Sequence, residues 1–229
     1  MLDERLSLAA ELYPVCELAA DIGTDHARLP AALLRSGRCG RMILTDLSPD
    51  ALANARREIC RQRLTDRAEF RLGNGLAPLR EPCQAISITG MGGRTIRGIL
   101  LDGRDQLRGA VLILSAHTDL PLVRAALREI GYAPDREEPC FCAGRYYLVI
   151  RALPGRTPQT DREIRLGSAL YTSASPVLLP YLRRRREILA ARLRGLLSAA
   201  VPDEALIREV REDLSFYDLK IGGITDDRT

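Results

Sequence analysis

Short apolar segments alternate with segments of helical periodicity along the first two thirds of the chain. Unbroken apolar runs of four to eight residues are typical of strands buried on both faces, whereas apolar residues at every third or fourth position indicate a helix. The predicted strands lie within 13–23, 41–46, 68–75, 84–90 and 109–116, with a strand pair around an Ala-Gly turn in 139–153. The predicted helices lie within 1–14, 26–37, 48–64, 91–103 and 118–132.

Local end signals support two of these helices. Ser48 is a preferred N-cap residue, and Pro49 follows it at the first helical position. Gly131 is placed to terminate the helix within 118–132. We therefore expect one helix to begin at Pro49 and another to end just before Gly131.

This alternation predicts an α/β fold. Strand–helix–strand units form parallel sheets with helices on both faces, and right-handed crossovers make such sheets doubly wound. We expect residues 1–153 to form a Rossmann-like domain whose ligand lies at the carboxyl ends of its strands. Four successive strand ends carry small or polar residues, which indicates a cleft: Asp21 with Gly23, Asp46, Asn74 with Gly75, and segment 90–93.

Residues 154–229 show a different pattern and form a predicted second domain. Segment 154–160 has the composition of a linker, and two segments of helical periodicity, 175–201 and 202–220, meet at Val201 and Pro202. So short a joint makes consecutive helices antiparallel, so we expect a coiled-coil-like helical hairpin. Its first helix carries Arg183, Arg184, Arg185 and Arg186, a full turn of which part must face water.

Composition narrows the class of protein. Hydrophobic residues make up 46% of the 229 residues, enough for a folded core, and no apolar run reaches the roughly 18 residues of a membrane span. The N-terminus lacks a signal-peptide pattern, so the expected location is the cytoplasm. The net charge of +4 does not by itself indicate nucleic acid, and the six cysteines lack paired metal-ligand spacing. We expect reduced thiols and no metal.

The cleft favours a nucleotide cofactor without phosphates. Asp46 lies 23 residues after Gly23, where a carboxylate can accept both ribose hydroxyls of a nucleotide. The G-x-G-x-x-G pattern is missing, and the bulky or acidic residues Thr24, Asp25 and His26 would crowd a pyrophosphate. S-adenosyl-L-methionine (SAM) fits better, because Asp21 or Asp25 could pair with its ammonium group.

Five stretches, in this order, resemble one family. They are DIGTDHARLP, TDLSPDALANAR, RLGNGLAPL, TGMGGRTIRGIL and LILSAHTDLPLVRAALREIGY. Together they resemble the bacterial tRNA adenine-N1 methyltransferases that modify adenosine 22 in the D-loop, which are class I SAM-dependent enzymes. The resemblance covers residues 2–151, and a C-terminal helical hairpin also belongs to that family.

The resemblance implies a set of site residues. Cofactor binding would fall to Asp21, Gly23, Thr24, Asp25 and His26 at the methionine end, to Asp46 and Leu47 at the ribose, to Gly73, Asn74 and Gly75 at the adenine, and to Thr89, Gly90, Met91 and Gly92 near the methyl group. The catalytic set would be Asp25, His26, Asn74, Met91, Gly92 and His117. Three positions depart from the family pattern: Arg28 replaces a tyrosine, Asn74 an aspartate and His117 an asparagine.

The chemistry under this interpretation is simple. Neutral N1 of adenine carries an in-plane lone pair, so the enzyme must mainly align it with the methyl carbon. The cationic product then sheds a proton from its exocyclic amine, for which His26, His117 or Asp25 are candidate acceptors. Contacts with tRNA phosphates are expected from Arg28, Arg94, Arg97 and the Arg183 to Arg186 run.

Three other hypotheses remain open at this point. They are a methyltransferase for a small molecule, a non-catalytic RNA-binding module that retains the fold, and a nicotinamide oxidoreductase. The expected partner is tRNA, with no membrane and no metal, and a monomer is favoured.

Overall fold

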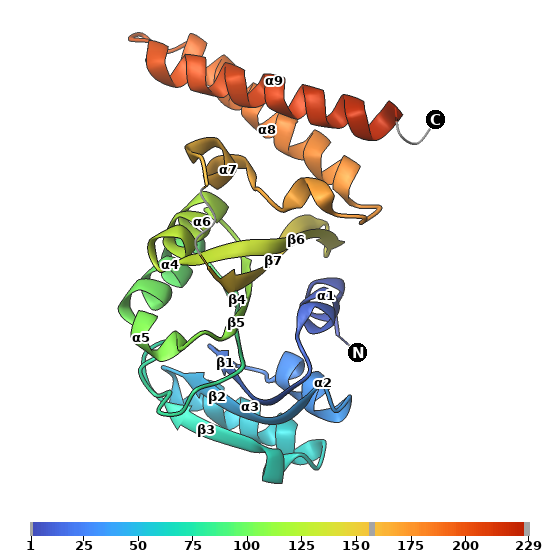
Figure 1. Ribbon diagram of the computed structural model, residues 1–229, viewed down its shortest axis with the longest axis vertical. Helices are drawn as coiled ribbons and strands as arrows, with labels where there is room; N and C mark the ends of the chain where they lie inside the picture. The colour runs from blue at the N-terminus through green and yellow to red at the C-terminus, as the bar shows by residue number, and fades with distance from the viewer. Residues whose placement is uncertain (1, 156–158, 227–229) are drawn as a thin grey trace. The chain divides into compact units, whose positions relative to one another are not determined.

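The computed structural model describes residues 2–155 and 159–226, in two compact units, Met1–Leu170 and Tyr171–Thr229 (Figure 1). The first unit is built on a seven-stranded sheet of order β3-β2-β1-β4-β5-β7-β6. Its strands are β1 (Cys16–Ile22), β2 (Cys39–Asp46), β3 (Ala68–Leu72), β4 (Ala85–Met91), β5 (Val111–Ala116), β6 (Tyr132–Cys142) and β7 (Arg145–Pro154). Strands β1 to β5 pair in parallel, and β7 runs antiparallel to both neighbours. The predicted doubly wound Rossmann-like sheet is confirmed.

Helices cover both faces of this sheet. Figure 1 shows α1 (Glu4–Leu12), α2 (Arg28–Arg35) and α3 (Pro49–Arg61) on one side, and α4 (Gly93–Asp102), α5 (Arg104–Leu107) and α6 (Leu120–Glu129) on the other. A single 3-10 turn, η1 (Thr65–Arg67), precedes β3. The sheet interior is apolar: Ala19, Leu44, Ile86 and Leu112 have no exposed surface. This packing leaves the polar strand ends as the place for chemistry.

The predicted end signals are confirmed. The hydroxyl of Ser48 accepts a hydrogen bond from the backbone N–H of Ala51, and Pro49 is the first residue of α3. Gly131, at a φ of +77°, follows the last residues of α6. Ala143 and Gly144 both have positive φ, as a tight hairpin turn between β6 and β7 requires.

A short helix after β7 shifts the boundary between the units. The sequence placed the end of the first domain at residue 153, but α7 (Asp161–Leu166) belongs to the first unit. The buried Arg124 of α6 donates hydrogen bonds to the backbone carbonyls of Ile164 and Arg165. The first unit therefore continues to Leu170, and residues 156–158 of the predicted linker lie outside the described part of the chain.

The second unit is a pair of long helices, as predicted. After η2 (Leu170–Thr172), α8 (Leu178–Leu197) and α9 (Glu204–Asp226) pack against each other. The Arg186 guanidinium of α8 donates to the Asp218 carboxylate of α9. Among the described residues, no helix has the length and apolar character that crossing a membrane requires.

Candidate functional site

The loop that follows β1 is wound tightly. Gly23, Asp25 and Ala27 have φ values of +75°, +29° and +48°, a region that non-glycine residues seldom adopt. The backbone N–H groups of Gly23 and Thr24 donate to the carbonyl of Thr45, at 2.8 and 3.1 Å. The loop is thus fixed to the end of β2, and strained backbone of this kind clusters at ligand sites.

A pocket of about 240 Å³ lies beside this loop. It is lined by Asp3, Arg5 and Leu6 near the start of α1, by Asp21, by residues 23–30, and by Thr89 and Gly90 at the end of β4. The pocket therefore brings together most of the residues that the sequence assigned to the methionine end of a cofactor.

Asp21 is the buried acid of this pocket. Its side chain is 5% exposed and accepts a hydrogen bond from the Ser87 hydroxyl, which in turn accepts one from the Tyr13 hydroxyl at 2.8 Å. Burial raises the pKa of Asp21 to about 6, although the hydrogen bond from Ser87 opposes the rise. A buried carboxyl that has no cationic partner among the described residues favours a cationic ligand.

Arg5 is the complementary group, and it is not among the site residues predicted from the sequence. Its Nη1 atom is buried and, within the described residues, has no hydrogen-bond partner. Its guanidinium lies 5.4 Å from the ring centroid of Tyr147, which in turn meets the ring of His117 edge-on at 5.7 Å. A guanidinium nitrogen that is buried without a hydrogen-bond partner is suited to an anionic ligand group.

The glycine-rich segment after β4 touches the loop after β1. A Cβ on Gly23 would lie 2.0 Å from the Met91 methyl carbon, so the Met91 side chain lies directly against Gly23, whose φ of +75° favours glycine. A Cβ on Gly93 would lie 2.5 Å from the Thr118 carbonyl oxygen, to which the Gly93 N–H donates. The DIGTDHARLP stretch therefore contacts the TGMGGRTIRGIL stretch, which in turn contacts the loop after β5.

His117 lies in this loop after β5. Its backbone N–H donates to the Met91 carbonyl at 2.9 Å, and its Nε2 is 3.9 Å from the position that a Cβ on Gly90 would take. The other two candidate proton acceptors, Asp25 and His26, are exposed and contact each other at 3.3 Å. His117 thus lies beside Gly90 and Met91, whereas Asp25 and His26 form a pair in the loop after β1.

Asp46 ends β2, next to the same loop. One of its carboxylate oxygens accepts from the N–H of Ser48 at 2.8 Å, and its backbone carbonyl accepts from Gly73 at 3.0 Å. Leu47 is 67% exposed beside it. The acid that ends β2 and the turn of Gly73, Asn74 and Gly75 are therefore joined directly.

Asn74 and Gly75 line a second hollow, of about 260 Å³, against α4 and α5. Its other walls include Thr95, Ile99 and Gln106, and the buried Gln106 Oε1 has no partner within the described residues. These wall residues were not predicted from the sequence, because nothing in their helical segments distinguishes them from other residues of a helix. The predicted cleft is thus two hollows along one sheet edge.

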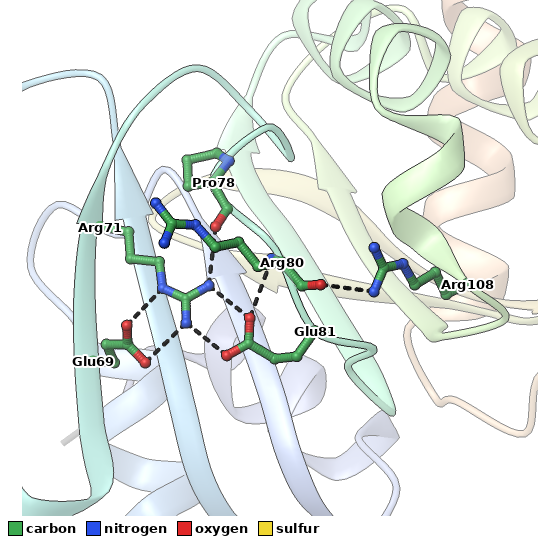
Figure 2. Close-up of polar contacts among 6 residues, drawn as sticks. All are labelled: Glu69, Arg71, Pro78, Arg80, Glu81 and Arg108. Atoms are coloured by element: carbon green, nitrogen blue, oxygen red, sulfur yellow. Dashed lines mark hydrogen bonds and ion pairs between the residues drawn. The ribbon is translucent and has the colours of Figure 1, made fainter.

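A network of charges holds the loop that follows this turn (Figure 2). Arg71 of β3 pairs with Glu69 and Glu81, at 2.7 and 2.6 Å, and donates to the Pro78 carbonyl at 2.9 Å. The Arg71 guanidinium lowers the pKa of Glu81 to about 2. Arg108 donates to the carbonyl of Arg80 at 2.8 Å. Residues 73–84 are therefore anchored by side chains on both flanks.

The predicted RNA-contacting arginines are dispersed. Arg28 is the first residue of α2 and lines the cofactor-sized pocket, whereas Arg94 and Arg97 are exposed on α4. In the second unit Arg184 pairs with Glu187 at 3.0 Å, Arg186 pairs with Asp218, and Arg183 is exposed.

Comparison with known proteins gives a consistent picture. Residues 2–150 match a family described as "Methyltransferase domain". A curated Bacillus subtilis (strain 168) protein, tRNA (adenine(22)-N(1))-methyltransferase, is 30% identical over 187 residues, which cover 81% of this chain and 76% of that protein.

The crystal structure of the B. subtilis m1A22 tRNA methyltransferase TrmK is 25% identical, with a TM-score of 0.85 over 96% of this chain and 99% of that one. A Streptococcus pneumoniae structure, described as a proposed tRNA (m1A22) methyltransferase in complex with SAM, is 25% identical, with a TM-score of 0.83 over 96% and 100% of the two chains.

Proposed function

This chain belongs to the tRNA (adenine(22)-N(1))-methyltransferase family, and we propose that it transfers a methyl group from SAM to N1 of adenosine 22 in bacterial tRNA. One structural observation supports this proposal above the others. The pocket after β1 holds a buried carboxyl, Asp21, and the half-buried Arg5, whose buried Nη1 atom has no hydrogen-bond partner within the described residues. The amino-acid end of SAM carries the two opposite charges that match this pair.

The pocket residues fit SAM as follows. Asp21 pairs with the ammonium group, and Arg5 donates to the carboxylate through the nitrogen that has no partner within the described residues. Gly23 and the neighbouring Thr24, Asp25 and His26 form the wall at the methionine end. When bound, SAM supplies an electrophilic methyl group on a sulfonium centre.

The remaining strand ends hold the nucleoside part. Asp46 accepts hydrogen bonds from the ribose hydroxyls, and the exposed Leu47 side chain offers an apolar surface beside it. The turn of Gly73, Asn74 and Gly75 faces the adenine edge, where the Asn74 amide replaces the carboxylate of the family pattern. The segment from Thr89 to Gly92 lies beneath the reacting methyl group.

The protein's part in the reaction is positioning followed by proton removal. Gly90 and Gly92 leave space for the target adenine above the β4 end, so that N1 can be held in line with the methyl carbon, and such alignment contributes about 7–11 kcal/mol. His117, which stands beside Gly90, accepts the proton that the cationic product releases. Asp25 and His26 are the alternative proton acceptors, and we rank them after His117 because both side chains are exposed.

Binding of tRNA completes the proposal. An adenosine in a folded loop must leave its stack, which costs a few kcal/mol. Phosphate contacts from Arg28, Arg94, Arg97 and the exposed part of the Arg183 to Arg186 run offset this cost. The cytoplasm, which holds the tRNA, is the proposed location.

The decisive experiment maps the methylated base. Purified protein is incubated with methyl-labelled SAM and unmodified tRNA transcripts, and the product is digested and sequenced by mass spectrometry. We expect N1-methyladenosine at position 22, its loss when position 22 is changed to guanosine, and at least a tenfold rise in the KM for SAM in Arg5→Met, as the loss of a charged hydrogen bond implies. The proposal would be rejected if no tRNA became labelled. It would also be rejected if, in a parallel reaction with a cell extract, the label appeared in a small molecule and not in tRNA.

A further inference from the structure

A second kind of hollow in the first unit extends beyond the cofactor pocket. It measures about 930 Å³ and is lined by one face of α2 and one face of α3. Its members on these helices include Arg28, Arg35, Arg57 and Arg61, and Glu58 is the one acid that lines it among the described residues. We call it the α2–α3 groove. His26 and Arg28 line both this groove and the cofactor pocket, so the two hollows share a border.

The groove carries positive charge that the protein does not neutralise. Glu58 pairs with Arg61 at 2.8 Å, and this contact lowers the pKa of the Glu58 carboxyl. Arg35 donates to the Gln62 amide oxygen at 3.2 Å, and Arg57 donates to the Asn54 amide oxygen. Across residues 2–155 and 159–226, no carboxylate lies within ion-pair distance of Arg28, Arg35 or Arg57.

Helical spacing arranges these cations in two rows. Arg28 and Arg35 are seven residues apart on α2, with the small Ala32 between them on the same face. Arg57 and Arg61 are four residues apart on α3. With a rise of 1.5 Å per residue, each row extends for about 6–10 Å, which suits two successive phosphates of a nucleic-acid strand.

The arginine run of α8 is a weaker candidate for the same task. Arg184 and Arg186 are already paired with Glu187 and Asp218. Arg185 is half-buried, and Tyr181 and Tyr217 are among the groups that raise its pKa. A phosphate that binds there must compete with these carboxylates, whereas Arg28, Arg35 and Arg57 of the α2–α3 groove have no carboxylate within ion-pair distance among the described residues.

We infer that the α2–α3 groove binds the phosphate backbone of the RNA substrate beside the target adenosine. This inference rests on the proposed function, because RNA is the anionic polymer that the adjoining methyl-transfer pocket would act on. The border formed by His26 and Arg28 lets a strand in the groove continue towards the cofactor. Guanidinium groups suit this task, since they donate two parallel hydrogen bonds to a phosphate.

The test removes two groove cations that lie away from the cofactor pocket. The variant Arg35→Gln/Arg57→Gln is compared with Arg80→Gln/Arg104→Gln, which removes the same charge from exposed sites outside the groove. Binding of an unmodified tRNA transcript is measured by fluorescence anisotropy over a series of KCl concentrations. S-adenosylhomocysteine affinity, measured by calorimetry, and the thermal midpoint show whether the pocket and the fold are intact.

The groove variant is expected to bind tRNA at least tenfold more weakly at low salt. The slope of log affinity against log salt should become shallower by about 1.4–1.8, as two lost phosphate contacts imply, while S-adenosylhomocysteine binding stays unchanged. A variant with the opposite effect on charge, Glu58→Gln, removes a negative charge from the groove and should tighten tRNA binding.

Two failures are distinguishable. If the wild-type protein forms no N1-methyladenosine at position 22, the proposed function fails. If the wild-type protein methylates position 22 but the Arg35/Arg57 variant matches the Arg80/Arg104 control in affinity and in salt slope, the RNA follows another surface and the inference is overturned.

Discussion

At the scale of single residues, the proposed site depends on the carboxyl of Asp21, which the fold buries and thereby makes harder to ionise. Asp21 is buried, and its pKa of about 6 lies well above its ordinary value of 3.8. At a pH between 3.8 and about 6, Asp21 is largely protonated in the folded protein but largely ionised in the unfolded chain. The ligand-free protein should therefore lose stability as pH rises from about 4 to about 6, by on the order of 3 kcal/mol, and stay level above.

This titration predicts how cofactor affinity depends on pH. A cationic ammonium group pairs with the ionised form of Asp21, so S-adenosylhomocysteine should bind more tightly as pH rises from 5 to 7, with most of the change near pH 6. Calorimetry across this range measures it. In Asp21→Asn the dependence should disappear, and in His26→Gln it should remain. A flat wild-type profile would show that Asp21 does not face the ammonium group.

Asp46 provides a second prediction at this scale. Asp46→Ala should raise the dissociation constant of SAM about tenfold or more, because an acceptor for the ribose hydroxyls is lost. Since the same carboxylate accepts from the N–H of Ser48, the alanine also removes a contact at the start of α3. Asp46→Asn keeps an oxygen acceptor for Ser48, and it separates the two effects. Unchanged affinity in both variants would mean that the ribose is held elsewhere.

At the scale of elements, the loops are held by side chains that reach out of strands and helices. Arg71 leaves β3 and fixes residues 78 and 81 of the loop that begins with the Gly73–Gly75 turn (Figure 2). Arg124 leaves α6, pairs with Glu137 of β6 at 2.6 Å, and reaches the carbonyls of α7. Each of these guanidinium groups therefore attaches a short neighbouring segment to the strand or helix that carries the arginine.

The Arg71 contacts predict an effect at a distance from the cofactor. Arg71→Met should loosen residues 73–84, lower the free energy of unfolding by about 1–2 kcal/mol, and weaken S-adenosylhomocysteine binding several-fold. Urea unfolding and calorimetry measure the two changes. The control Arg108→Met removes only the bond to the Arg80 carbonyl at the far end of the loop, and it should affect affinity less. Equal effects of the two variants would mean that the turn is not held through Arg71.

At the scale of the whole molecule, periodicity was enough to predict the sheet and the helix pair. Apolar runs predicted β1, β2, β4 and β5, and Ser48 and Gly131 marked the helix ends that the structure has. These signals are local, since each depends on residues within one element. The role of Arg5 could not be predicted from such local signals, because its position on an amphipathic helix does not show that its guanidinium lies near Gly90 and Tyr147, which are distant in sequence. For the same reason α7, only six residues long, was taken as part of the second domain.

The division into two units leads to a final prediction. The proposed cofactor site draws only on residues of the first unit, Met1–Leu170. A ligand that binds only the folded form stabilises it by about 2.7 kcal/mol at a concentration one hundred times its dissociation constant. In hydrogen exchange followed by mass spectrometry, saturating S-adenosylhomocysteine should therefore slow exchange up to about a hundredfold in peptides that cover β1 and β4. Peptides that cover α8 and α9 should exchange at an unchanged rate, and Asp46→Ala at the same ligand concentration should show reduced protection of β1 and β4. Equal slowing in α9 would show that the two units open as one cooperative body.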